Sequence, residues 1–169
     1  MGNQNNKGRN IRGTLMSSAR MLLAAMVVLL SNNEHSASAA TIDKTAVQYV
    51  RAADPTAPFS AAVRVENILY LSGQIGVAAD GRLPPQFADQ VRQTMENVTA
   101  TLKASGSSLE EVFKCTVMLT DMSRWEDFNR IYVTYFKPER LPVRSAIGAN
   151  GLARGAMLEL ECVAYSPRL

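Results

Sequence analysis

Residues 112–120 (VFKCTVMLT) constrain the fold more than any other segment, because they are rich in β-branched and apolar side chains. Such a composition is typical of a β-strand. Successive side chains of a strand point to opposite faces of its sheet. Apolar residues occupy both alternating sets of positions here, so both faces of the sheet that contains this strand need to be covered.

Two segments have the spacing of helices. Residues 87–102 carry apolar side chains every three or four positions, and Gly106 is suited to cap the C-terminus of that helix. Ser123 and Glu126 have the pattern of a capping box and predict a second helix. Its apolar face, interpreted as core, consists of Trp125, Phe128, Ile131 and Tyr135.

The remaining segments read as strands, and Glu66-Asn67 has the length of a hairpin turn between two of them. The resulting order β-β-β-α-β-α-β-β predicts an α+β fold, with a mixed sheet of about six strands and both helices on one face. The face without helices is expected to be covered by oligomerisation. The expected strands cover residues 46–50, 61–65, 68–71, 112–120, 144–149 and 157–165.

Residues 1–39 differ from the rest of the chain. They contain four basic residues before their first acid, Glu34, then an uncharged apolar run at 21–30, and small residues up to Ala39. This order is typical of a secretory signal peptide, and the run is shorter than the roughly 20 residues of a membrane span. We therefore expect cleavage near Ala39, export to the periplasm without membrane attachment, and a single domain over residues 40–169.

The charge balance then excludes several classes of function. The whole chain has 18 Lys+Arg and 15 Asp+Glu, and removal of the leader leaves 14 of each. The basic pI thus belongs to the leader, and no nucleic-acid partner is expected. His35, the only histidine, would leave with the leader, which excludes a Ser-His-Asp or Cys-His catalytic set and histidine metal ligands. We expect no metal and no cofactor.

Cys115 and Cys162 are the only cysteines, and both lie in strand-like runs among apolar residues. Two cysteines in an exported chain could pair. Their apolar surroundings instead favour two buried free thiols, which is our expectation, with a disulfide as the alternative.

Arg144 is the main candidate for binding a ligand. Pro142 fixes the backbone just before it, and a guanidinium fits a carboxylate in bidentate fashion. A small anionic substrate is therefore expected, with a surface ion pair as the alternative. Glu159 and Glu161 follow in one strand and point to the same side of it.

Together these features resemble the Rid family, the YjgF-type reactive intermediate deaminases. The resemblance implies a chorismate-mutase-like fold and a homotrimer with sites in the clefts between subunits. It also implies hydrolysis of a 2-imino acid to a 2-keto acid and ammonia, as in a 2-iminobutanoate/2-iminopropanoate deaminase. The matching segments are residues 72–75 (SGQI), 97–98 (NV), Asn129, Tyr132, 142–145 (PVRS) and 158–164 (LELECVA).

The resemblance also implies roles for single residues. Arg144 would grip the substrate carboxylate, and Glu159 would assist the water or the departing amine. Ser72 and Asn129 would line the cleft; a backbone hydrogen bond for Ser72 and a surface amide for Asn129 are the alternatives. Two cleft positions depart from the family pattern: Phe59 stands where many members have tyrosine, and Ala146 where many have cysteine.

An imine carbon is already electrophilic, so its hydrolysis needs an anion clamp, a placed water and a proton-transfer group. Two other functions remain open from the sequence. One is a Rid-like module that binds small anions or unfolded chains without turnover. The other is a ribonuclease, which the neutral charge and missing histidine of the predicted mature chain disfavour.

Overall fold

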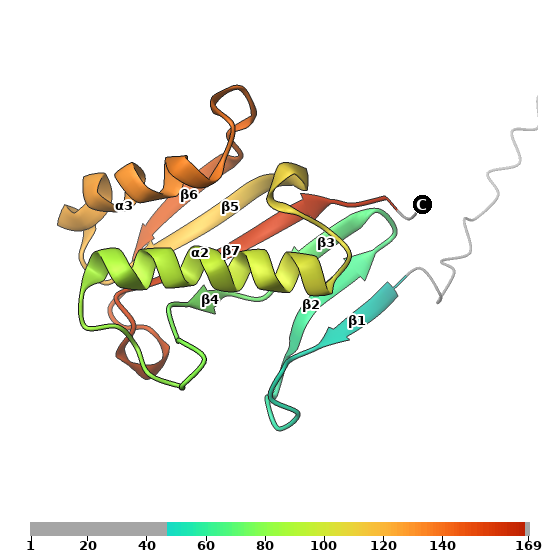
Figure 1. The fold of residues 1–169 in the computed structure, drawn as a ribbon, viewed down its shortest axis with the longest axis horizontal. Coiled ribbons are helices and arrows are strands. Elements are labelled where there is room, and N and C mark those ends of the chain that lie inside the picture. The colour runs from blue at the N-terminus through green and yellow to red at the C-terminus, as the bar shows by residue number, and fades with distance from the viewer. Residues whose placement is uncertain (1–46, 168–169) are drawn as a thin grey trace, which may run out of the picture. The chain divides into compact units, whose positions relative to one another are not determined.

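The computed structural model describes residues 47–167, which contain two α-helices and a seven-stranded sheet (Figure 1). Short 3₁₀ turns connect several of these elements. In chain order the elements are β1 (Val47–Arg51), β2 (Ser60–Val65), β3 (Ile68–Leu71), β4 (Gln74–Ile75), α2 (Phe87–Ala104), β5 (Val112–Leu119), α3 (Trp125–Tyr132), β6 (Val143–Gly148) and β7 (Leu158–Tyr165).

The sheet has the order β1-β2-β3-β7-β5-β6, and the short β4 pairs with β7 beside β3. Only the β5–β6 pair is parallel within this described sheet; the other pairs are antiparallel. Both helices lie on the same face of the sheet (Figure 1). The predicted α+β class with two helices on one face is confirmed, while the expected strand list lacked β4.

The core lies between α2, α3 and the sheet. The predicted apolar face of α2 is buried, and it packs against alternate residues of β5 and β7. Val117, Leu119, Leu158 and Leu160 are fully buried in this layer. Burying such side chains stabilises the fold by roughly 1.5–3 kcal/mol each.

The C-terminus of α2 confirms one predicted helix cap, and the N-terminus of α3 corrects another. Gly106 has a φ of 71° after α2, and the Ser107 amide donates to the Leu102 carbonyl, as in a Schellman motif. The predicted capping box at residues 123–126 is wrong. Asp121 instead accepts from the Ser123 amide, because it stands at the start of the 3₁₀ turn that precedes α3.

The face of the sheet without helices exposes apolar side chains. It carries the residues that alternate with the buried ones, including Tyr70, which is 49% exposed, and Ile147, which is 52% exposed. Val63 and Met118 are half-buried on the same face. This composition agrees with the expectation of a covered face, and the trimer itself stays a prediction.

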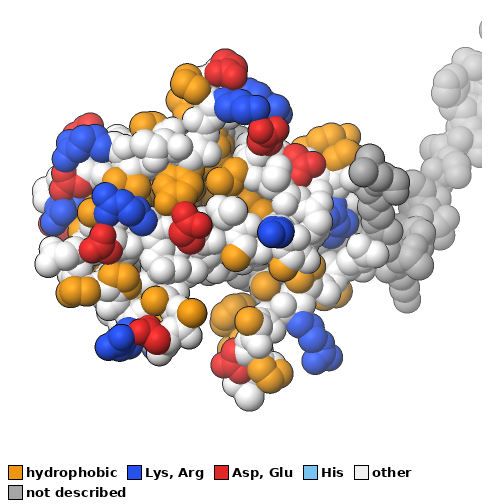
Figure 2. Space-filling view, viewed as in Figure 1, with side chains coloured by type: hydrophobic (Ala, Val, Ile, Leu, Met, Phe, Trp, Pro, Cys, Tyr) orange, Lys and Arg blue, Asp and Glu red, His pale blue; other side chains and the backbone are white. Residues whose placement is uncertain are grey.

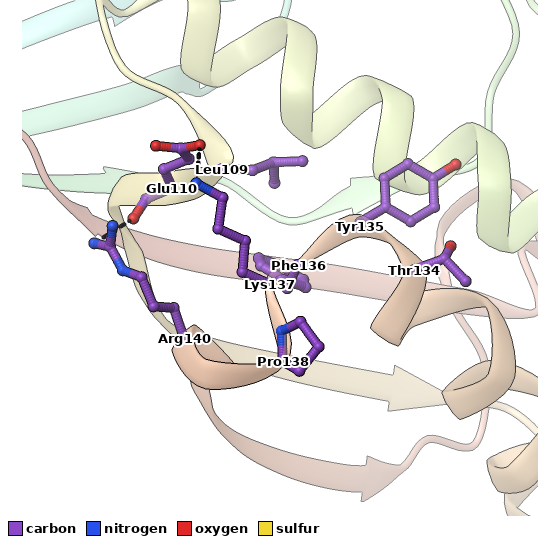
Figure 3. Close-up of a pocket in the computed structure, with 8 residues that line it drawn as sticks. All are labelled: Leu109, Glu110, Thr134, Tyr135, Phe136, Lys137, Pro138 and Arg140. Carbon is purple, nitrogen blue, oxygen red and sulfur yellow. Dashed lines mark hydrogen bonds and ion pairs between the residues drawn. The ribbon is translucent and has the colours of Figure 1, made fainter.

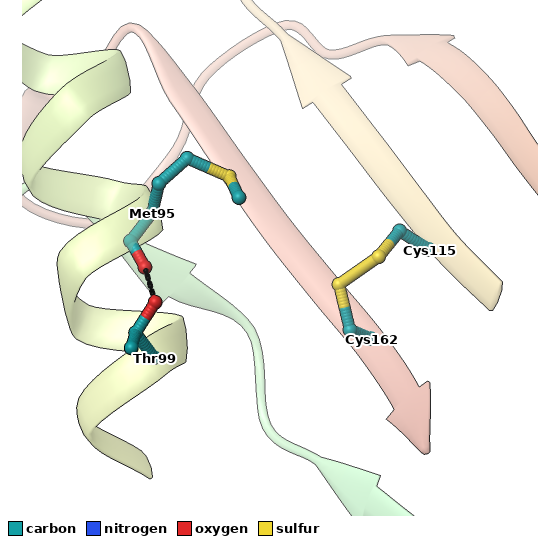
Figure 4. The surroundings of a disulfide bond; sticks show 4 residues. All are labelled: Met95, Thr99, Cys115 and Cys162. Atoms are coloured by element: carbon teal, nitrogen blue, oxygen red, sulfur yellow. Dashed lines mark hydrogen bonds between the residues drawn. A yellow bond between two sulfur atoms is a disulfide. The ribbon is translucent and has the colours of Figure 1, made fainter. Parts of the chain in front are cut away.

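The structure contradicts the expectation of two free thiols. Cys115 and Cys162 are directly opposite each other on β5 and β7, and a disulfide joins them (Figure 4). Both cysteines are only 1% exposed. Apolar surroundings fit a buried thiol and a buried disulfide equally well, so the strand register decides between them.

The predicted secretory leader lies outside the described residues. Among residues 47–167 no helix is long and apolar enough to cross a membrane, and no sign of a signal peptide is found. The interpretation of residues 1–39 as a signal peptide is therefore corrected, and export is not proposed.

The disulfide should contribute measurably to stability, because it closes a loop of 47 residues. Reducing it should lower the free energy of unfolding in urea by roughly 4 kcal/mol on a loop-entropy basis. The double variant C115A/C162A is the control, since its unfolding midpoint should not respond to reductant. An unchanged midpoint for the reduced wild type would show that the thiols are not paired.

Candidate functional site

Arg144 lies on the edge strand β6, on the face of the sheet that the helices cover. Its guanidinium carbon is 4.5 Å from the ring centres of both Trp125 and Tyr132 and 5.4 Å from that of Phe128. Its Nη2 donates a hydrogen bond of 2.7 Å to Oδ1 of Asn129. One face of α3 therefore holds the arginine by three aromatic rings and one amide.

The positive charge of Arg144 is not compensated by a carboxylate among the described residues, in which every ion pair found involves other groups. Burial lowers the pKa of Arg144 below its ordinary value, and the neighbouring Tyr132 opposes that shift. Arginine nevertheless stays protonated in proteins. Burial in turn raises the pKa of Tyr132 to about 12, although the charge of Arg144 opposes it.

Glu159 lies on β7 and points to the other face of the sheet. Its neighbours Leu158 and Leu160 are buried beneath the helices, whereas Glu159 is half-buried opposite Met118. Its carboxylate lies directly over Gly73: a Cβ built on that glycine would be 1.8 Å from Oε1. Gly73 therefore leaves the space in which this carboxylate is placed.

Two amides fix the backbone around Glu159. Nδ2 of Asn97 on α2 donates to the carbonyls of Ile75 and Val77, at 2.8 and 3.0 Å, and so anchors the β4 segment that pairs with Glu159. Gln90 donates to the Pro84 carbonyl and accepts from the amide at position 157, just before β7.

Of the remaining predicted site residues, some lie near Gly73 and Glu159 and others lie near Arg144. Ser72 adjoins Gly73, and its hydroxyl donates to the Ser60 carbonyl at 2.6 Å, which is the backbone bond considered as its alternative. Phe59 precedes Ser60 and is 59% exposed. Ala146 is exposed on β6, two positions beyond Arg144 and on the same face.

The predicted site residues therefore do not all lie together within one chain. Arg144, Asn129 and Ala146 lie together on the helix-covered side of the edge strand. Glu159 lies on the opposite face, because it alternates with the buried residues of β7. A single substrate cannot contact Arg144 and Glu159 of the same sheet from one side.

A cavity of about 360 Å³ lies elsewhere, between the 3₁₀ turn before β5 and the connection from α3 to β6 (Figure 3). Its lining includes Lys137, which forms an ion pair of 2.8 Å with Glu110, and Arg140, which donates to the Glu110 carbonyl. Lys137 and Arg140 are thus already bound to other groups of the protein. None of the predicted site residues lines this cavity.

The helix-covered face mixes charged side chains of both signs with hydrophobic ones (Figure 2). Within residues 47–167 no cluster of three or more His, Cys, Asp or Glu side chains is placed to hold a metal ion.

Sequence reasoning missed the role of the α3 aromatics in holding Arg144. Successive rings of Trp125, Phe128, Tyr132 and Phe136 are in contact, with ring centres 5.9, 5.2 and 4.8 Å apart; the first two pairs are stacked and the last is tilted. The sequence pattern predicts Trp125 and Phe128 as core, on one face with Ile131 and Tyr135. The signal that could have separated the two readings is the surplus of aromatic residues on one short helix, since a cation binds to aromatic faces.

Comparison with known proteins agrees with this geometry. The family model described as "Endoribonuclease L-PSP" matches residues 50–166. A "RutC family protein" of Aquifex aeolicus is 38% identical over 65% of this chain and 90% of its own length. A mouse protein named "2-iminobutanoate/2-iminopropanoate deaminase" is 35% identical over 73% of this chain and 93% of its own. The chain belongs to the Rid family.

Solved Rid structures have the same fold. RidA from the Antarctic bacterium Psychrobacter is 34% identical, with a TM-score of 0.63 over 71% of this chain and 98% of its own. The yeast protein YEO7 is also 34% identical, with a TM-score of 0.66 over 72% of this chain and 99% of its own. The predicted Rid membership and YjgF-type fold are thereby confirmed.

The contact between Gly73 and Glu159 can be tested by filling the space. Gly73→Ala should displace the carboxylate and lower imine hydrolysis by about tenfold or more, if Glu159 transfers protons. The melting temperature should change little, because the nearest clashing atoms end a flexible side chain. Gly151→Ala is the matched control, since no atom lies within 4 Å of its new Cβ. Equal activity of the two variants would remove Glu159 from the site.

Proposed function

We propose that the protein hydrolyses 2-imino acids to 2-keto acids and ammonia, in clefts shared by two copies of the chain. The observation that carries this proposal is the guanidinium of Arg144, which is fixed in position but not neutralised by a carboxylate in the described part of the chain. Such a group suits a substrate carboxylate next to the reacting carbon. Relatives named 2-iminobutanoate/2-iminopropanoate deaminase support the same reaction.

The chemistry follows from the two groups. Arg144 binds the carboxylate and holds the imine carbon for attack. Water adds to the carbon of the protonated imine, and Glu159 accepts a proton from that water. Glu159 then returns the proton to the nitrogen of the carbinolamine, the C–N bond breaks and ammonia leaves, and the hydroxyl loses its proton to solvent as the carbonyl of the 2-keto acid forms. This acid–base role is worth roughly 10²–10⁴-fold in rate.

The geometry of one chain supports a site that two copies share. Arg144 and Glu159 point to opposite faces of their sheet, so a complete site takes Arg144 from one chain and Glu159 from its neighbour. The apolar face without helices supplies the contact surface for such an assembly. A homotrimer is the expected form, and no membrane or nucleic-acid partner is proposed.

Arg144 can be tested by ammonia release from imines that an amino-acid oxidase generates in situ. Arg144→Ala should lower kcat/KM by roughly 10²-fold or more, because it removes the charge-assisted pair. Arg144→Lys keeps the charge without the bidentate geometry and should rescue activity only in part. Glu159→Gln should lower kcat more than it raises KM. Wild-type rates in Arg144→Ala would show that the site is elsewhere.

The shared site can be tested by assembly. Light scattering should give three times the mass of one chain, and a monomer at micromolar concentration would contradict the proposal. Co-refolding the inactive variants Arg144→Ala and Glu159→Gln should restore part of the activity, because some clefts then combine an intact Arg144 with an intact Glu159. Mixing without refolding is the control and should restore none.

A wild type that binds 2-keto acids but releases no ammonia would favour the non-catalytic binding module. The matching family model is described as "Endoribonuclease L-PSP", so cleavage of RNA by the purified wild type would favour the ribonuclease instead.

A further inference from the structure

Arg144 differs from the other arginines that contact α3. Arg124 and Arg130 share the carboxylate of Asp127, so each of them already has an anionic partner. Arg144 contacts aromatic rings and an amide oxygen instead, both of which are uncharged.

This difference changes what a ligand encounters. An arginine that already binds a carboxylate must give up that partner, or share it, before it binds another anion. Aromatic faces attract a guanidinium through the ring quadrupole and leave its net charge unchanged. The amide of Asn129 engages only one of the five N–H groups, and no other hydrogen bond of this guanidinium is found within residues 47–167.

Tyr132 and Trp125 differ in burial, and this difference shows which part of each side chain acts on Arg144. Tyr132 is only 2% exposed, and its hydroxyl has no hydrogen-bond partner in the described structure. Its contribution to Arg144 therefore comes from the ring and not from the hydroxyl. Trp125 is half-buried, so its ring can be changed with less damage to the core.

We propose that Trp125 and Tyr132 are positioning residues that hold Arg144 without neutralising it, so that its full charge is kept for the substrate carboxylate. This inference rests on the proposed binding role of Arg144, but it does not require turnover. It assigns to the aromatic face of α3 a function beyond core packing. It also explains why the hydrogen-bond acceptor at position 129 is an amide: a carboxylate there would be an internal counter-ion.

The ring contribution is tested with Trp125→Leu and its matched control Trp125→Phe, which keeps an aromatic face. Binding of 2-ketobutyrate is measured by calorimetry, and KM and kcat are measured with the imine. Trp125→Leu should weaken binding and raise KM by about tenfold, with kcat changed much less. Trp125→Phe should stay within about threefold of wild type. Equal binding by the two variants, with equal melting temperatures, would overturn the proposal.

Tyr132→Phe separates the ring from the hydroxyl. It keeps the ring, so it should weaken 2-ketobutyrate binding less than Trp125→Leu does, because the lost hydroxyl has no partner in the described structure. A tenfold loss of binding in this variant would show that the hydroxyl acts on the ligand, and would overturn the assignment of the ring.

The charge argument is tested with Asn129→Asp against Asn129→Ser. Aspartate has nearly the shape of asparagine but adds a counter-ion 2.7 Å from Arg144, whereas serine shortens the side chain and adds no charge. Asn129→Asp should weaken 2-ketobutyrate binding by about tenfold more than Asn129→Ser does. The proposal fails if the two variants bind alike.

These outcomes are distinguishable from a failure of the proposed function. If the wild type binds 2-ketobutyrate but releases no ammonia, the hydrolase fails, while the Trp125 and Asn129 comparisons still decide the role of the rings. If the wild type binds no 2-keto acid, the proposal that the rings position Arg144 for a substrate carboxylate is rejected.

Discussion

The pairing of β5 with β7 is the interaction on which the rest of the structure depends. It is the longest antiparallel ladder of the sheet, it buries alternate residues of both strands under α2, and a disulfide crosses it. β6 pairs with the outer edge of β5, and β4 pairs with β7. Because side chains alternate with a period of two, a slip of one residue in this ladder would turn Glu159 into the core and Leu160 out of it.

The same alternation separates the two chemical groups. Arg144 takes the side of Cys115, its partner on β5, and so meets α3, while Glu159 takes the side of Met118. The arginine is held by aromatic rings, and the glutamate carboxylate lies in the space over Gly73. One chain thus presents the two groups on opposite faces of its sheet.

Sequence patterns predicted what depends on local order. The period of α2, the hairpin at residues 66–67 and the cap at Gly106 follow from neighbours in the chain. Features that depend on the register between strands could not be predicted from the sequence pattern. The disulfide requires β5 and β7 to place two cysteines, which are 47 residues apart in the sequence, directly opposite each other. The short β4 was missed because it is only two residues long. The contact of Trp125 with Arg144 was missed because aromatic residues that pack in the core and aromatic residues that contact a cation have the same spacing along a helix.

The disulfide has a topological consequence. Cys115 and Cys162 close a covalent ring that contains α3, β6 and the first half of β7, so Trp125, Arg144 and Glu159 all belong to it. Ser72 and Phe59 are outside. The exposed connection at residues 137–141 lies within the ring. A protease that cuts the backbone there would open the ring without releasing a fragment, and the two ends of the cut chain would remain joined through the centre of the sheet.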